Sequence, residues 1–214
     1  MKKVITLLLI TLMAVSAFSL KFGGGWPSVS YIPGDQLLNP IKDTVKLGFS
    51  EGIFAFGGGG MGRIGSGPIF LGGEGFDGYS SKKDKYKFSA SYGSFLIGTS
   101  YDTFNFVSLD AGLGLGGFTQ KIDVYQDGVN KDKEGFIDGS SPYINTISID
   151  SFIVSPYIGI TLKPTDFFGF FIKGKYTVGV SFDGWKFESG DRVKGLENKG
   201  INFYELSAGI VFGY

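Results

Sequence analysis

The last eleven residues of the chain alternate between two kinds of side chain. The odd positions are small or polar apart from Val211, and the even positions are apolar or aromatic: Tyr204, Leu206, Ala208, Ile210, Phe212 and Tyr214. A period of two predicts a β-strand with one apolar face and one polar face. Because the last residue is an aromatic ring, we expect the apolar face to meet lipid and the ring to lie at the membrane interface.

The N-terminal segment has the order of a secretory signal peptide. A short basic start precedes an apolar run that ends at Val15, and small residues follow it. We expect residues 1–19 to be removed by cleavage after Ala17 or Ser19, which leaves residues 20–214 as one exported domain. The apolar run is about a dozen residues long, whereas a membrane-spanning helix needs roughly 20.

Composition limits the chemistry that the chain can perform. It contains no Cys and no His, which excludes disulfides and thiolate metal sites and removes the commonest general base and transition-metal ligand. We therefore expect no enzymatic activity, cofactor or metal. The formal net charge of the full chain is zero, and loss of two lysines with the leader leaves the mature chain at −2. Nucleic acid is therefore not an expected partner.

Eight alternating segments follow the leader, and the connections between them predict the topology. We expect strands at about 20–26, 51–63, 68–79, 86–101, 104–122, 146–162, 167–182 and 200–214. The connections run long, tight, medium, tight, long, tight, long, so all the tight ones lie on one side. The only sheet that lipid tolerates is a closed one, and bacterial barrels have short periplasmic turns and longer outer loops. The sequence therefore predicts an all-β fold, a single antiparallel up-and-down transmembrane barrel.

The three segments between 104 and 182 assign the faces of the wall. Each has one face of large apolar residues and an opposite face of glycine, hydroxyl and charged residues, with Phe171 the intruder on the polar face of the seventh segment. A soluble barrel encloses its bulky apolar residues, so here we expect the apolar face to lie outside. The second and fourth segments do not alternate cleanly, and their faces stay open.

Five charged residues fall on the expected inner face: Glu74, Asp110, Lys173, Lys175 and Glu205. An eight-stranded barrel is just wide enough for side chains to fill, and a buried charge without a partner costs several kcal/mol. We expect opposite charges to pair across the lumen as a structural network that fills it. A polar path or gate is the alternative.

Glycine runs on the second, third and fifth segments admit two explanations: they relieve crowding inside a narrow barrel, or they let another element approach the sheet. A candidate element is a short helix in the first long connection. Asn39 is a good N-cap, Pro40 suits the first helical position and Gly48 ends the pattern. We expect this helix to fold over the rim or to enter the barrel mouth.

The eight segments, the sorted connections and a last strand that ends in Phe212 and Tyr214 together resemble the small eight-stranded outer-membrane proteins of the OmpA/OmpX type in Gram-negative bacteria. The resemblance covers nearly all of the mature chain. It implies location in the outer membrane, contact with outer-membrane lipid, and an assembly signal at Phe212 and Tyr214 that the barrel assembly machinery reads.

Function is less constrained than location. The leading hypothesis is a non-enzymatic barrel, a structural envelope component or narrow pore with a largely filled polar lumen. The alternative is a barrel that binds or transports a small apolar molecule, with the Leu37–Val45 segment as a lid. A pocket lined by Phe54, Phe56 and Phe171 would favour this alternative. A soluble secreted barrel is a third possibility, and the outward apolar faces are its difficulty.

Overall fold

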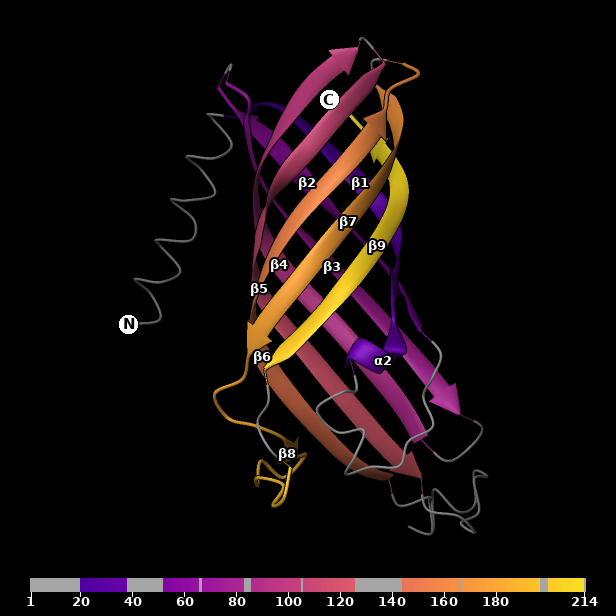
Figure 1. Cartoon of the computed structure of the whole chain (residues 1–214), viewed down its shortest axis with the longest axis vertical. Helices are drawn as coiled ribbons and strands as arrows, with labels where there is room; N and C mark the ends of the chain where they lie inside the picture. Colours follow the sequence, from indigo (N-terminus) through magenta and orange to yellow (C-terminus); the bar gives the residue numbers. More distant parts are fainter. Residues whose placement is uncertain are drawn as a thin grey trace, which may run out of the picture.

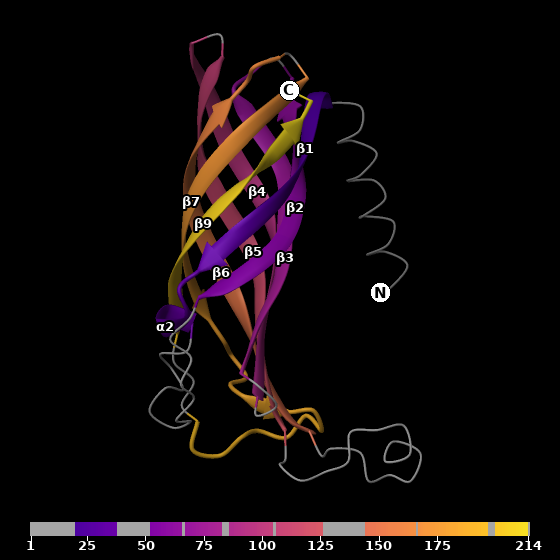
Figure 2. The ribbon, with the colours of Figure 1, turned by 90° about the vertical axis from the view of Figure 1, so that its right-hand side faces the viewer.

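The computed structural model describes residues 20–37, 52–65, 67–82, 86–104, 106–125, 144–165, 167–196 and 200–213. They form an elongated, closed barrel of tilted antiparallel strands (Figure 1; Figure 2). The eight wall strands are β1 (Leu20–Ile32), β2 (Ile53–Ile64), β3 (Ile69–Lys82), β4 (Tyr86–Phe104), β5 (Val107–Tyr125), β6 (Ile144–Leu162), β7 (Phe168–Val180) and β9 (Ile201–Phe212). Among the described residues, no helix is long and apolar enough to cross a membrane.

Each wall strand pairs with its neighbours in the chain, and β1 pairs with β9 to close the barrel. The short strand β8 (Lys186–Phe187) pairs only with β6. It lies with the four-residue helix α2 (Gly34–Leu37) at one end of the barrel, which we call the loop end, whereas β9 finishes at the opposite, tight-turn end (Figure 1). The predicted up-and-down barrel of eight strands is confirmed.

The first strand is longer than the sequence predicted, because it continues through Pro27 to Ile32 instead of ending at Trp26. Proline cannot donate to a ladder. Pro27 is tolerated in the strand because it pairs with Gly58 of β2 on one side only. On its other side, the ladder to β9 is interrupted between Gly25 and Ser28.

The turn between β4 and β5 also differs from the prediction. It falls between Phe104 and Val107 instead of at Asp102–Thr103, and the pairing shifts between Asp102 and Phe104. Ser108 Oγ donates a hydrogen bond of 2.6 Å to Asp102 Oδ1, and the two residues are paired across the strands. At this turn β4 therefore runs three residues further than predicted, to Phe104, and β5 begins three residues later, at Val107.

Large apolar side chains cover the outside of the wall. The faces predicted for β5, β6 and β7 are confirmed, since Leu109, Ile158 and Ile172 are exposed while their neighbours in the strand point inward. The structure also assigns the faces of β2 and β4, which the sequence left undecided. On β2, Phe54 and Phe56 point outward, and on β4 Tyr92 and Leu96 point inward.

The polarity of the two faces reverses along β4, β5 and β6. Towards the tight-turn end, the row Phe95, Leu115 and Val154 is apolar and outward. Two rows further towards the loop end, the outward row is Ser91, Thr119 and Asp150, with a hydrogen bond of 2.6 Å from Thr119 Oγ1 to Asp150 Oδ1. The inward residues change in the opposite sense, from glycine and serine to large apolar side chains.

The interior at the loop end is therefore apolar, which corrects the prediction of a polar inner face throughout. The buried cluster, which we call the apolar plug, comprises Ile32, Leu37, Ile53, Ala55, Phe76, Phe88, Ala90, Tyr92, Phe118, Ile122, Ile149, Ile153, Trp185, Ile201 and Phe203. These segments have water-facing polar residues outside, so they bury their large side chains as a soluble barrel does.

Inward glycines provide room for inward rings. A Cβ added at Gly112 would lie 2.5 Å from Tyr157 Oη, one at Gly59 would lie 2.7 Å from the Trp26 ring, and one at Gly209 would lie 2.7 Å from the Phe171 ring. Of the two explanations for the glycine runs, relief of crowding accounts for Gly59 and Gly112. The predicted helix that begins after Asn39 lies outside the described residues, as do the leader 1–19 and Tyr214.

Candidate functional site in the barrel lumen

Four charged side chains from three strands meet in the middle of the lumen, and we call them the charge cluster. Lys175 of β7 lies between two carboxylates, with Nζ 2.5 Å from Glu74 Oε1 and 3.2 Å from Glu205 Oε2. Lys173, two residues earlier, reaches the other oxygen of Glu74 at 3.0 Å. All four side chains are buried. The cluster holds two positive and two negative charges, so its formal charge is zero.

Neutral groups complete the coordination of the charge cluster. Ser30 Oγ donates to Glu205 Oε1 at 2.8 Å, and Tyr92 Oη donates to Glu74 Oε1 at 2.8 Å. The ammonium of Lys173 also lies over the rings of Trp26 and Tyr157, at 4.8 and 4.9 Å from their centroids. Cation–π contacts of this kind stabilise a desolvated ammonium.

Asp110 lies apart from the charge cluster, although it faces inward from β5. Its Oδ2 accepts a hydrogen bond of 2.6 Å from Thr161, and it makes no ion pair with any described residue. The register places Asp110 on the same row as Lys173, because Gly159 pairs with both residues. The separation arises from the side chain of Lys173, whose ammonium binds Glu74 instead. The structure thus brings together Glu74, Lys173, Lys175 and Glu205 of the five residues selected from the sequence.

Inside the lumen, little space remains around the charge cluster. A hollow of about 480 Å³, which Lys175 and Glu205 also line, opens instead among outward side chains such as Ile158 and Tyr204. The void beside Glu74, Lys175 and Glu205 has a volume of about 10 Å³, which is the lower limit for holding one water molecule. On the loop-end side the apolar plug fills the lumen. On the opposite side lies a larger cavity of about 100 Å³, which we call the vestibule.

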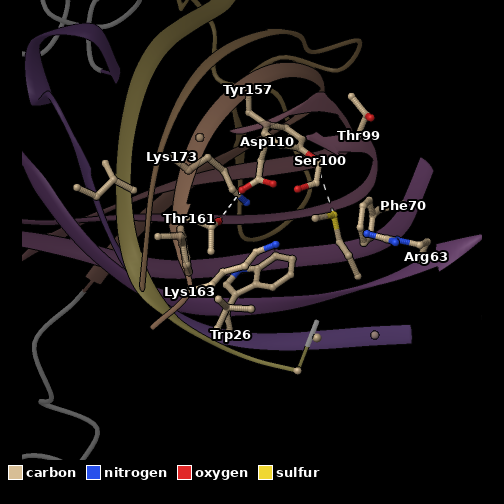
Figure 3. A pocket seen from close by; sticks show the side chains of 18 residues that line it. Trp26, Arg63, Phe70, Thr99, Ser100, Asp110, Tyr157, Thr161, Lys163 and Lys173 are labelled. Carbon is tan, nitrogen blue, oxygen red and sulfur yellow. Dashed lines mark hydrogen bonds between the residues drawn. The ribbon is translucent and has the colours of Figure 1, made fainter. Parts of the chain in front are cut away.

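The vestibule has both apolar and polar walls (Figure 3). Trp26, Tyr157 and Phe171 line it on the side of the charge cluster, where Lys173 also reaches its wall. The rings of Trp26 and Phe171 meet edge to face at 6.1 Å. Asp110, Thr161 and Ser100 lie on one side in Figure 3, and Arg63 and Phe70 lie together on another. The guanidinium carbon of Arg63 stands 5.0 Å from the centroid of the Phe70 ring.

The loop between β7 and β9 closes the other end of the lumen. Trp185 is buried in the apolar plug, and Val193 and Leu196 pack against the plug. Val193 N donates to Trp185 O at 2.9 Å, and Phe187 of β8 pairs with Ile147 of β6. In the same loop, Lys186 donates to Asp183 at 2.7 Å and holds the pKa of that carboxyl below its usual range.

The first connection contributes one residue to the plug. Leu37 is buried, and its carbonyl accepts a hydrogen bond of 2.8 Å from Gln120 Nε2. The neighbouring Gln36 accepts from Tyr204 N at 2.7 Å. The rest of the suggested Leu37–Val45 lid lies outside the described residues. The pocket considered for an apolar ligand does not form, because Phe54 and Phe56 point outward while Phe171 points inward.

Sequence reasoning missed the aromatic members of the site. Tyr92 donates to Glu74, and Trp26 and Tyr157 enclose Lys173. Tyr157 lies on the predicted inner face of the sixth segment, but nothing in the sequence links it to a lysine. For Tyr92 the missing signal was the face of β4, which did not alternate cleanly. Trp26 was assigned to the end of a strand that in fact continues past it.

Comparisons with known proteins identify the class of fold. No family model and no curated protein matches the sequence. A major outer membrane protein of Thermus thermophilus has a similar structure, with a TM-score of 0.57, 10% identity, and coverage of 91% of this chain and 100% of the other. Neisserial surface protein A is similar with a TM-score of 0.51, 13% identity, and coverage of 90% and 97%. The fold is that of the small outer-membrane β-barrels.

Proposed function

We propose that this chain is a non-enzymatic barrel of the outer membrane with a closed lumen, a structural component of the envelope. The observation that supports this most directly is the reversal of polarity along β4, β5 and β6. Where the outward residues are apolar, the wall suits lipid, and where they become polar, it suits water. A wall in which the apolar zone is followed by the polar zone along the strands fits a barrel that projects from a membrane.

The same reversal gives the barrel an orientation. Bacterial barrels keep their tight turns in the periplasm and extend their long connections outward. In this orientation the polar rows that include Ser91, Thr119 and Asp150 stand above the outer surface of the membrane. The apolar plug, which includes Phe118, then lies inside the projecting part and stabilises it without help from lipid.

Two successive barriers support a structural role over a channel. The charge cluster leaves a void of about 10 Å³, and the apolar plug fills the lumen beyond it. An ion that crossed would have to displace paired charges and then a packed hydrophobic core. Hydrolytic activity is disfavoured by the sequence itself, which contains no His.

Single cysteines test the placement, because the natural chain has none. Lys121→Cys is outward beyond the reversal, Leu109→Cys is outward in the apolar zone, and Thr165→Cys is in a tight turn. On intact cells, an impermeant maleimide should label only the variant at 121. The variant at 165 should react only after the outer membrane is permeabilised. The variant at 109 should react neither on intact cells nor after permeabilisation. Equal labelling at 109 and 121 would disprove the membrane zone, and labelling of 165 alone on intact cells would reverse the orientation.

A further inference from the structure

Two opposite charges on the wall of the vestibule, Asp110 and Arg63, form no ion pair with a described residue. Asp110 accepts one hydrogen bond, from Thr161, and makes no ion pair. Arg63 makes no hydrogen bond or ion pair with a described residue, and its Nε is buried without a partner. By contrast, Lys173 is bound to Glu74, and Lys163 is bound to Asp102 at 2.7 Å.

A buried Nε without a hydrogen-bonding partner, as in Arg63, is uncommon in folded proteins and calls for a partner. A carboxylate oxygen needs a donor, and a guanidinium offers its donors in a fork that matches a carboxylate. Asp110 and Arg63 face the same cavity. A ligand that carries an ammonium and a carboxylate would satisfy both, and it would add no net charge to a poorly hydrated space.

We propose that the vestibule binds a small zwitterion of amino-acid size, with its ammonium towards Asp110 and its carboxylate towards Arg63. The hydroxyls of Ser100 and Thr161 stand beside Asp110 and complete the polar wall. Trp26 and Phe171 provide an apolar surface for a short side chain.

The size of the cavity restricts the ligand. Its volume is about 100 Å³, less than the roughly 150 Å³ of a cavity that accommodates benzene. Alanine, with as many non-hydrogen atoms as benzene, is therefore close to the upper limit of what the enclosed part holds. Singly charged ligands fit the charges less well, because an anion leaves Asp110 unpaired and a cation leaves Arg63 unpaired.

Trp26 supplies a reporter for this binding. The chain has two tryptophans, and the other, Trp185, lies in the apolar plug beyond the charge cluster. In the full-length mature protein carrying Trp185→Phe, purified in detergent, the remaining fluorescence comes from the wall of the vestibule. L-Alanine, L-lactate and L-alaninamide are probes of matched size that are zwitterionic, anionic and cationic.

L-Alanine should change the Trp26 emission in a saturable manner, and the two singly charged probes should bind about tenfold more weakly or worse, since each loses one charged hydrogen-bonding partner. Arg63→Gln and Asp110→Asn should each weaken L-alanine binding to the same degree. The controls Arg192→Gln and Asp150→Asn, which lie far from the vestibule on the loop-end half, should leave binding unchanged.

Folding of every variant is checked by the difference in gel migration between boiled and unboiled samples. The probe series on the parent protein tests the proposal even if a variant does not fold. No saturable response to L-alanine at tens of millimolar (roughly −2 to −3 kcal/mol) would overturn the proposal. Equal affinity for the three probes would overturn it as well, and so would full binding by both folded variants.

Discussion

Lys175 and Glu205 occupy paired positions on β7 and β9, and their side chains turn into the lumen with 3.2 Å between Nζ and Oε2. This carboxylate has no other cationic partner among the described residues. The pair is therefore the simplest place to measure what the charge cluster contributes to stability.

Replacement of Lys175 by Met should lower the free energy of unfolding by roughly 3–5 kcal/mol, because two buried carboxylates then lose their shared cation. Glu205→Gln should cost less, since Lys175 keeps Glu74. The double variant should recover part of the summed loss, as coupled residues do. Urea titration of the barrel in lipid vesicles measures each value.

The matched control for this cycle is Lys121→Met, which removes a surface ion pair with Asp123 at 3.6 Å. Exposed pairs contribute about 0–1 kcal/mol, so its effect should be small. Strictly additive losses at positions 175 and 205 would show that the two side chains are not energetically coupled.

A lysine on the lipid face should be costly only inside the membrane. Ile158 is 72% exposed in the middle of the apolar zone of β6, and Ile158→Lys should destabilise the barrel by about 2–4 kcal/mol, as lysine does at the membrane midplane. Ser91→Lys, on the outward face of β4 beyond the reversal and paired with Asp77, should cost almost nothing. The comparison uses folding titrations in vesicles, and similar costs at both sites would contradict the membrane zone.

Glycine at 112 should be required by the close approach of the Ile97 carbonyl and of the Tyr157 ring. An added methyl group would lie 2.5 Å from Tyr157 Oη, and overpacking of this kind costs typically 1–3 kcal/mol. Gly117→Ala is the control on the same strand, because nothing lies within 4 Å of its added Cβ. If thermal denaturation gives equal midpoints for the two variants, the glycine at 112 is not there to make room for the ring.

The planar-bilayer conductance of the purified protein should be small or absent, because the charge cluster and the apolar plug obstruct the lumen in series. Phe118→Ala with Phe203→Ala removes two facing rings, whose centroids are 5.0 Å apart, from the plug. Since the charge cluster remains, this double variant should still conduct little. Large, steady currents in the parent protein would refute the closed lumen.

The closing strand should govern assembly. Phe212 points outward and packs near Phe167 and Phe168, with ring centroids 6.2 and 6.1 Å away. We expect Phe212→Asp to lower the amount of assembled barrel in the outer membrane sharply, because it places a charge on the lipid face of the last strand. Phe95→Asp, which places the same charge on the outward face of β4, is the control for a charge outside the closing strand. Immunoblots of unboiled membranes give the assembled fraction, and unchanged assembly of Phe212→Asp would exclude Phe212 from the signal.

The period-two pattern was sufficient to predict that the wall is built of eight strands and to assign the lipid face of β5, β6, β7 and β9, because every second side chain in the membrane zone of these strands meets lipid. Partners across the lumen were not predictable in the same way. Lys173 reaches Glu74 of β3, and this contact depends on strand stagger and barrel diameter, which no local pattern records.

The apolar plug was missed for a different reason. Phe118 and Ile122 continue the alternation of β5, but the inner face there is apolar and the outer face is polar. A strand that passes from lipid into water keeps its period and exchanges the character of its faces. A single inside-outside assignment for the whole strand therefore fails beyond the crossing point.

Pro27 has a consequence for how the cylinder is completed. Within the described residues, five paired positions join β1 to β9, fewer than join any other neighbouring wall strands, since the ladder lapses at Trp26 and Pro27. The junction between the N-terminal and C-terminal strands is thus the seam with the fewest hydrogen bonds. Local opening is easiest where the fewest bonds break, so the wall closes last and opens first at this seam. A chaperone that inserts the chain and releases the barrel here therefore has the fewest inter-strand hydrogen bonds to exchange.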